Sequence, residues 1–156
     1  LMDEEIEVVA TDHCAFNLSQ KRKEDSCLTV LPGIPGSETL LPLIHHYGRE
    51  KGMDYSRLVN ILSTNPAKIF GLYPEKGSLQ PGTDADLVVI DPEKHLELKN
   101  SNLHSQAGYS PYHEFEVIGC PIMTFLRGEI ISKDGDFKGV RGSGRFVKGD
   151  KSCFYR

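Results

Sequence analysis

The first strong apolar pattern in the chain is a short β-branched run that ends in polar residues. The run covers residues 6–10 and gives way at once to Thr11-Asp12-His13. Such runs are typical of strands, and in a parallel α/β protein the residue at the carboxyl end of a strand points into the ligand crevice. Asp12 is therefore a candidate metal ligand or proton-transfer group. The alternative is that its carboxylate accepts backbone N–H groups at the start of a loop, as aspartate often does.

A second pattern has the spacing of an α-helix. Ser37 is a candidate N-cap for this helix, and Gly52 ends it. Because proline fits only the first turn of a helix, Pro42 predicts that the regular part begins near Leu41. The apolar stripe of this helix is Leu40, Leu41, Ile44 and Tyr47.

A further helix is predicted to open at Asp54 and to stop near residues 63–66. The residue before a proline is pushed out of the helical region, so Pro66 marks the expected end. Pro66 is itself well placed to begin a short helix, which Gly71 closes. The buried side of the longer helix is predicted to be Tyr55, Leu58, Ile61 and Leu62.

Beyond residue 73 the pattern changes from helical to alternating. Turn residues fill 77–83, and a strand over 85–90 is predicted to end at Asp91-Pro92. The first half of the chain is therefore predicted to be α/β and the second mostly β, with a boundary near 73–77. Further predicted elements are an alternating stretch at 95–98, a hairpin in which residues 123–126 return through 130–131 around Arg127-Gly128, and a turn at 133–136.

Composition argues against several classes of function. The chain has 156 residues, 38% of them hydrophobic, which is ordinary for a soluble globular domain. A formal net charge of -4 gives no electrostatic argument for nucleic acid or a membrane surface as a partner. No apolar run approaches the roughly 18–20 residues that cross a bilayer. The acidic first residues also lack the cationic-then-apolar order of a signal peptide.

The cysteines and the paired histidines give little sign of chemistry. Four cysteines occur without a Cys-x-x-Cys pair, which favours reduced thiols in a cytoplasmic protein over disulfides or a zinc finger. Cys14 has no partner base in the sequence, so we expect a small buried side chain and not a nucleophile. His45 and His46 are adjacent and face different directions, so we expect structural or surface residues and not metal ligands.

The segment between the first strand and the first helix is a long loop in two parts. Residues 17–26 are polar and carry a run of charges, so a solvated loop is the default, although loops of this length are often lids or binding loops. Residues 31–36 contain two prolines and two glycines, which fix an irregular backbone. Gly33 in this loop lets another group approach the main chain closely.

Taken in order, these motifs resemble the dihydropyrimidinase/hydantoinase branch of the cyclic amidohydrolases. Each block alone is modest, but together they span nearly the whole chain in the family order. The blocks are Thr11-Asp12-His13-Cys14, residues 31–36, residues 63–74, residues 76–79, residues 81–88, Thr124-Phe125-Leu126-Arg127-Gly128, and residues 142–146.

The resemblance implies a TIM-barrel hydrolase with a two-metal site and a small β-sandwich built from both chain termini. A TIM barrel needs roughly 200–250 residues, and this chain has 156. We therefore expect a C-terminal fragment. Residues 1–73 would belong to the end of the (β/α)8 barrel, and residues 74–156 to part of the β-sandwich and a C-terminal tail.

The resemblance also implies metal-dependent hydrolysis of a cyclic amide in the complete protein, with a dihydropyrimidine, a hydantoin or a related ureide as substrate. Family members hold two divalent metal ions, expected to be zinc, through a His-x-His pair, a carboxylated lysine, two further histidines and one aspartate. Only the aspartate has a match here, Asp12, in the roles of metal ligand and catalytic proton carrier. The fragment is therefore expected to be inactive alone.

The same resemblance assigns a substrate-binding role to the main chain at Gly33. Hydantoinases commonly carry asparagine at that position, so backbone contacts could persist here but side-chain contacts could not. The resemblance further implies a homo-oligomer, a tetramer or a dimer, for the complete protein.

Two related functions stay open as alternatives. Dihydroorotases share the Gly-Ile-Pro-Gly loop, but they place a proline and a histidine where this chain has Ala15 and Phe16. That difference favours a neutral cyclic amide over dihydroorotate. The other alternative is a collapsin-response-mediator-like tetrameric scaffold, a non-enzymatic relative that has lost metal ligands, and the presence of Asp12 favours the enzyme.

Overall fold

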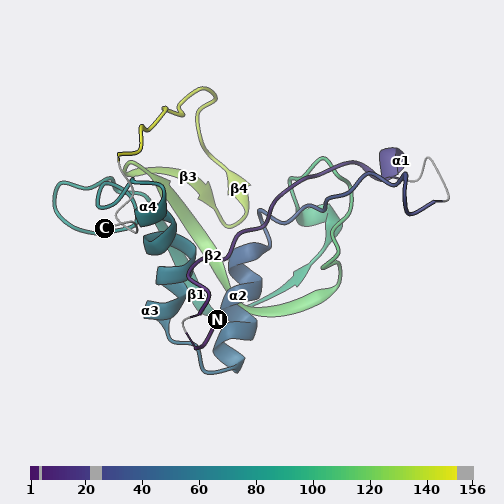
Figure 1. Ribbon diagram of the computed structural model, residues 1–156, viewed down its shortest axis with the longest axis horizontal. Helices are drawn as coiled ribbons and strands as arrows, with labels where there is room; N and C mark the ends of the chain where they lie inside the picture. The colour runs from purple at the N-terminus through teal and green to yellow at the C-terminus, as the bar shows by residue number, and fades with distance from the viewer. Residues whose placement is uncertain (4, 22–25, 151–156) are drawn as a thin grey trace.

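The computed structural model describes residues 1–3, 5–21 and 26–150 as a group of helices packed on a small sheet (Figure 1). The helical elements are α1 (Leu18–Lys21), α2 (Leu40–Glu50), α3 (Tyr55–Val59), a π-helical turn η1 (Asn60–Thr64), α4 (Asn65–Ile69) and a 3-10 turn η2 (Asn100–Asn102). The strands are β1 (Leu87–Leu98), β2 (Phe115–Leu126), β3 (Glu129–Lys133) and β4 (Asp136–Phe137). The sheet is antiparallel, with the strand order β1-β2-β3-β4, and α2 packs against β2.

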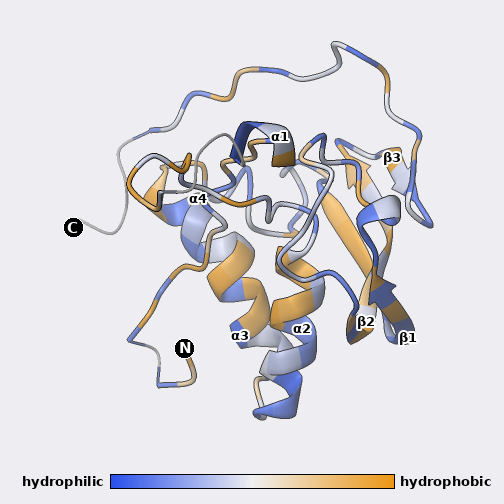
Figure 2. Cartoon of the chain, turned by 90° about the vertical axis from the view of Figure 1, so that its right-hand side faces the viewer, coloured by the Kyte–Doolittle hydropathy of each residue, from blue (hydrophilic) through white to orange (hydrophobic). Residues whose placement is uncertain are grey.

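Two small apolar clusters form the core. One lies among the helices and consists of Met53, Leu58 and Ile61, and the other lies on the sheet and consists of Leu98, Val117 and Cys120. Figure 2 shows the apolar stretches of α2, α3 and β2 in orange. The predicted buried side of the helix that opens at Asp54 is confirmed for Leu58 and Ile61. The prediction is wrong for Tyr55, which is 45% exposed.

The N-terminal run predicted as a strand crosses the helices in an extended form without joining a sheet (Figure 1). A strand needs neighbours for its N–H and C=O groups, and the described residues place no other strand beside this one. Hydrogen bonds to the helices hold the segment instead. Arg57 Nη2 donates to the carbonyl of Ile6 at 2.7 Å, and Asn65 Nδ2 donates to that of Glu7 at 3.0 Å.

Helix α2 begins and ends as predicted, but Ser37 is not its cap. The helix starts at Leu40, close to the predicted Leu41, and its N-terminal side chains make no capping hydrogen bond. The N–H groups of Thr39 and Leu40 both donate to the carbonyl of Gly36 at 3.1 Å. A backbone turn that starts at Gly36 therefore takes the place of the side-chain cap predicted at Ser37. Gly52, with φ +86°, follows the last turn as expected.

Pro66 does not stop the preceding helix. Asp54 caps α3 as predicted, accepting the N–H of Arg57 at 2.7 Å, but the helical run continues through η1 into α4. In the wider π turn, the N–H of Asn65 donates to the carbonyl of Asn60. Pro66 has no N–H to offer. The carbonyl of Ile61 is thereby left free, and it accepts the N–H of Val9 at 3.2 Å.

The first strand of the sheet also outlasts its predicted end. Strand β1 continues past Asp91-Pro92 to Leu98, because its register against β2 shifts between Asp91 and His95. Proline has no N–H to donate to the neighbouring strand. Because Pro92 lies within the register shift, no hydrogen bond from its nitrogen is required. The hairpin between β2 and β3 is confirmed, and Arg127 and Gly128 form its turn with φ values of +50° and +85°.

Two adjacent histidines join α2 to the peptide group of one residue in β2. His45, which is 3% exposed, has Nδ1 at 3.0 Å from the carbonyl of Ile118. The N–H of Ile118 donates to His46 Nδ1 at 3.2 Å. The structural role predicted for these histidines is confirmed.

Candidate functional site

The Asp12 carboxylate lies on the surface at the end of the N-terminal run. The backbone of Asp12 is left-handed, with φ +45°, a conformation that aspartate tolerates better than most residues. Among the described residues, no hydrogen bond or ion pair reaches its carboxylate, and the N–H of His13 donates instead to Thr11 Oγ1 at 3.1 Å. The carboxylate is thus not used to satisfy backbone groups of the described chain.

The loop that carries Gly33 lies directly against the Asp12 segment. The N–H of Cys14 donates to the carbonyl of Ile34 at 3.2 Å. Gly33 has φ +112°, and a Cβ added there would lie 2.5 Å from the carbonyl oxygen of Cys14. Only glycine fits at this crossing, which agrees with the prediction that Gly33 lets another group approach the main chain closely.

Cys14 departs from its prediction as a small buried side chain. It is exposed, and its thiol lies 3.9 Å from the carbonyl of Pro32. The Gly33 loop packs against one side of Cys14, close to its carbonyl oxygen, Cβ and Sγ, and the residue stays exposed overall.

His13 links the two segments through its side chain, a role that the sequence did not indicate. The N–H groups of Gly36 and Ser37 donate to His13 Nδ1 at 3.0 and 3.2 Å. A histidine beside a candidate ligand carries no local signal for a bond to a residue 23 positions away. Asp12 and the loop of Gly33 are therefore brought together by tertiary contacts.

The residues present fit a metal ion only as one part of its ligand set. An exposed carboxylate without other partners is a suitable oxygen ligand, and Asp12 provides one. In residues 1–3, 5–21 and 26–150, no group of three or more histidine, cysteine, aspartate or glutamate side chains is placed to hold a metal. The described chain can therefore supply one ligand, and further ligands would have to come from elsewhere.

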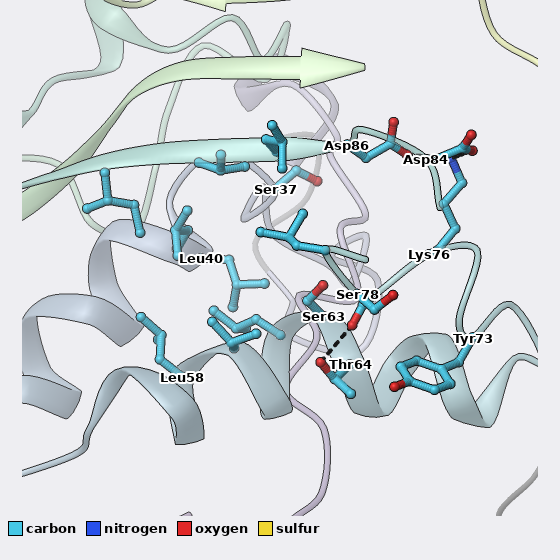
Figure 3. A pocket seen from close by; sticks show the side chains of 18 residues that line it. Ser37, Leu40, Leu58, Ser63, Thr64, Tyr73, Lys76, Ser78, Asp84 and Asp86 are labelled. Atoms are coloured by element: carbon cyan, nitrogen blue, oxygen red, sulfur yellow. Dashed lines mark hydrogen bonds and ion pairs between the residues drawn. The ribbon is translucent and has the colours of Figure 1, made fainter. Parts of the chain in front are cut away.

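A large cavity lies away from Asp12, between the helices and β1 (Figure 3). Its volume is about 720 Å³, and much of its wall is leucine, valine and isoleucine. Asp12 and Gly33 are not among the lining residues, so the candidate hydrolytic chemistry does not belong to this cavity. Leu40, Leu58, Ser63, Thr64, Lys76 and Asp86 are among the residues that line it.

At one end of this cavity, Lys76 lies between two carboxylates. Its Nζ is 2.6 Å from Asp84 and also donates to Asp86, while Asp86 accepts the N–H of Arg127 at 2.7 Å. Burial alone would lower the pKa of Lys76, but its hydrogen bonds with Asp84 and Asp86 and their charges raise it. Burial would likewise raise the pKa of Asp86, but the hydrogen bonds from Lys76 and Arg127 and their charges lower it.

The lowered pKa of Asp86 gives a prediction for stability in acid. A carboxyl whose folded pKa lies below its ordinary value of 3.8 adds stability above that value and loses the contribution as pH falls through the lower one. We expect the urea midpoint to fall steeply below about pH 4, and to fall less in Asp86→Asn. Asp136→Asn is the control, because its ion pair with Lys138 is exposed. Equal acid sensitivity in both variants would contradict the prediction.

Comparison with known proteins identifies the family. The sequence profile of the Amidohydrolase family matches residues 6–131. The chain belongs to the amidohydrolase family. It is 40% identical over 151 residues to a D-phenylhydantoinase of Escherichia coli O81 (strain ED1a), covering 95% of this chain and 33% of that protein. The chain thus spans about a third of the length of the curated relatives it matches.

Solved structures agree with this family assignment. A D-hydantoinase (dihydropyrimidinase) from Thermus sp. superposes with a TM-score of 0.89 at 35% identity, over 94% of this chain and 32% of that one. An L-hydantoinase (dihydropyrimidinase) from Arthrobacter aurescens gives 0.74 at 37% identity, over 78% and 27%. The predicted resemblance to the hydantoinase branch is confirmed. The likeness supports the assignment of the chain as a fragment of a TIM-barrel amidohydrolase, and this fragment carries a small antiparallel sheet. No helix in the described residues is long and apolar enough to cross a membrane.

Proposed function

We propose that this chain is part of a hydantoinase-type cyclic amidohydrolase, which hydrolyses a C–N bond in a neutral cyclic amide such as a hydantoin or a dihydropyrimidine. The observation that carries the proposal is the juxtaposition of the Asp12 carboxylate, which has no partner among the described residues, with the loop of Gly33, in a chain 40% identical to a D-phenylhydantoinase. Residues 1–73 would belong to the metal-binding barrel and residues 74–156 to a β-sandwich part and tail. The complete protein would be a cytoplasmic homo-oligomer, a tetramer or a dimer.

The roles of the residues follow from their chemistry. Two divalent metal ions, which we propose to be zinc, would lower the pKa of a bound water and polarise the substrate carbonyl. Asp12 would be one ligand to them. Its carboxylate would take the proton that the attacking water gives up and deliver it to the ring nitrogen as the C–N bond breaks. The hydrolysis yields one carboxyl group and one new N–H bond. Because the described residues hold no group of three or more metal-binding side chains, the chain would not be catalytic by itself.

The Gly33 loop would hold the substrate ring through its main chain. The glycine backbone at φ +112° is fixed by its contact with Cys14, which gives the loop a defined position next to Asp12. Backbone N–H and C=O groups can bond an amide ring without the help of a side chain. The relatives named above favour neither a dihydroorotase nor a collapsin-response-mediator-like scaffold.

The decisive test is metal-dependent turnover by the complete protein. We expect hydrolysis of hydantoin or dihydrouracil to be lost after dialysis against a chelator and regained with Zn²⁺ or another divalent ion. Continued full turnover by metal-free protein would contradict the proposed mechanism. Absence of turnover with metal in place would support the scaffold alternative.

Substrate choice gives a separate prediction. The half-buried Phe16 follows the Asp12 segment where dihydroorotases carry a histidine, and an aromatic ring cannot neutralise a carboxylate. We expect kcat/KM for dihydrouracil or hydantoin to exceed that for dihydroorotate by at least about tenfold. Phe16→His should narrow this ratio, and Phe16→Leu should leave it unchanged. A clear preference of the unmodified protein for dihydroorotate would mean that another residue supplies the missing cation.

A further inference from the structure

Two backbone N–H groups converge on a single atom of His13. Gly36 N lies 3.0 Å and Ser37 N lies 3.2 Å from His13 Nδ1. A ring nitrogen that accepts hydrogen bonds carries no proton, so this contact requires the tautomer with its proton on Nε2. The backbone of His13 is held in turn by its bond to Thr11 Oγ1 at 3.1 Å. The ring therefore has a defined orientation and acts as an acceptor.

The two segments touch at both ends of their crossing, but with different kinds of contact. At the Gly33 end, the backbone bond between Cys14 and Ile34 joins them. At the Gly36 end, the described residues offer no hydrogen bond between the segments other than those of His13. Gly36 also passes close to Thr11, since a Cβ added there would lie 3.2 Å from Thr11 Cβ. The His13 ring is thus what fixes the second end of the loop.

We propose that His13 is a positioning residue that fixes the Gly33 loop relative to Asp12 and so sets the affinity for the cyclic amide. The proposal rests on the function proposed above and adds a residue to it. His13 follows Asp12 directly in the chain, so its ring ties the loop to the backbone that carries the carboxylate. The ring acts through the N–H groups of Gly36 and Ser37, and it does not need to touch the substrate.

A matched pair of variants in the complete protein separates this role from simple packing. Asn places Oδ1 at the same number of bonds from Cα as His13 Nδ1, and so keeps an acceptor, whereas Leu keeps a similar shape without one. Loss of two hydrogen bonds corresponds to a change in KM of about tenfold. We expect His13→Leu to raise KM for hydantoin by about this factor, with a smaller effect on kcat. His13→Asn should have a KM much closer to that of the unmodified protein. Metal content should be unchanged in both.

His46→Leu is the control. His46 Nδ1 also accepts a backbone N–H, that of Ile118 at 3.2 Å, but in the contact between α2 and β2. The His46→Leu variant should have a lower stability and an unchanged KM for hydantoin. An unchanged KM in His13→Leu, equal defects in the Leu and Asn variants, or loss of bound metal along with activity would each overturn the proposal.

Amide hydrogen exchange separates this proposal from the proposed function. Gly36 and Ser37 should exchange slowly in the unmodified protein and in His13→Asn, and faster in His13→Leu. If the complete protein fails to hydrolyse hydantoin, the proposed function fails, but this exchange pattern would still support the link made by His13. Equal exchange in all three proteins would overturn that link.

Discussion

Asp12→Asn in the complete protein is expected to lower kcat/KM for hydantoin or dihydrouracil by at least about a thousandfold, because one change would remove the proposed proton carrier and the charge of the proposed metal ligand. Asparagine is a better substitution than alanine at this position. It keeps the shape of aspartate and tolerates the φ of +45° at this position. Alanine would add about 1 kcal/mol of backbone strain. The measurement is steady-state turnover together with bound metal.

The fold should survive this change. Among the described residues nothing donates to the Asp12 carboxylate, so removing its charge breaks no contact that holds the described chain together. Asp3→Asn, in the same exposed N-terminal segment, is the control and should keep full activity. Near-normal turnover by Asp12→Asn would remove Asp12 from the mechanism.

Gly119→Ala is expected to destabilise the protein by about 3–4 kcal/mol, through backbone strain and overpacking together. Gly119 has φ +88°, and a Cβ there would lie 1.9 Å from His45 Cε1 and 2.1 Å from Nδ1. The His45 ring is 3% exposed and bonded to the carbonyl of Ile118, so it cannot move away without breaking the contact between α2 and β2. Urea denaturation measures the loss.

Two further variants divide this effect into its causes. Gly128→Ala has a similar φ of +85° but no atom within 4 Å of the added Cβ, so it should cost only the backbone strain of about 1 kcal/mol. Combining Gly119→Ala with His45→Ala removes the ring and should recover part of the stability. Equal losses for the Gly119 and Gly128 variants would contradict the steric argument.

Elements set by contacts between near neighbours could be predicted from the sequence. Helix α2, the Asp54 cap, the closure by Gly71 and the turn at Arg127-Gly128 depend on hydrogen bonds and φ values within a few residues. The order of motifs also indicated the family, because each block is a local pattern. Asp12 was selected as a candidate in the same way, by its place at the end of an apolar run.

Where a distant partner decided the outcome, the local pattern was insufficient. Pro66 should have ended a helix, but a π turn absorbs it and frees the Ile61 carbonyl for Val9. Pro92 should have ended a strand, but the register shift against β2 lets the strand continue. The N-terminal run has the composition of a strand yet pairs with none in the described chain, because a strand needs neighbours.

The candidate site shows the same division. The sequence by itself determined which groups are chemically suited, a carboxylate at Asp12 and a permissive backbone at Gly33. Only the tertiary structure decided that they lie together, through the Cys14–Ile34 bond and the His13 ring. These contacts join residues 20 or more positions apart, and no local propensity encodes a hydrogen bond whose two partners meet only when the chain has folded.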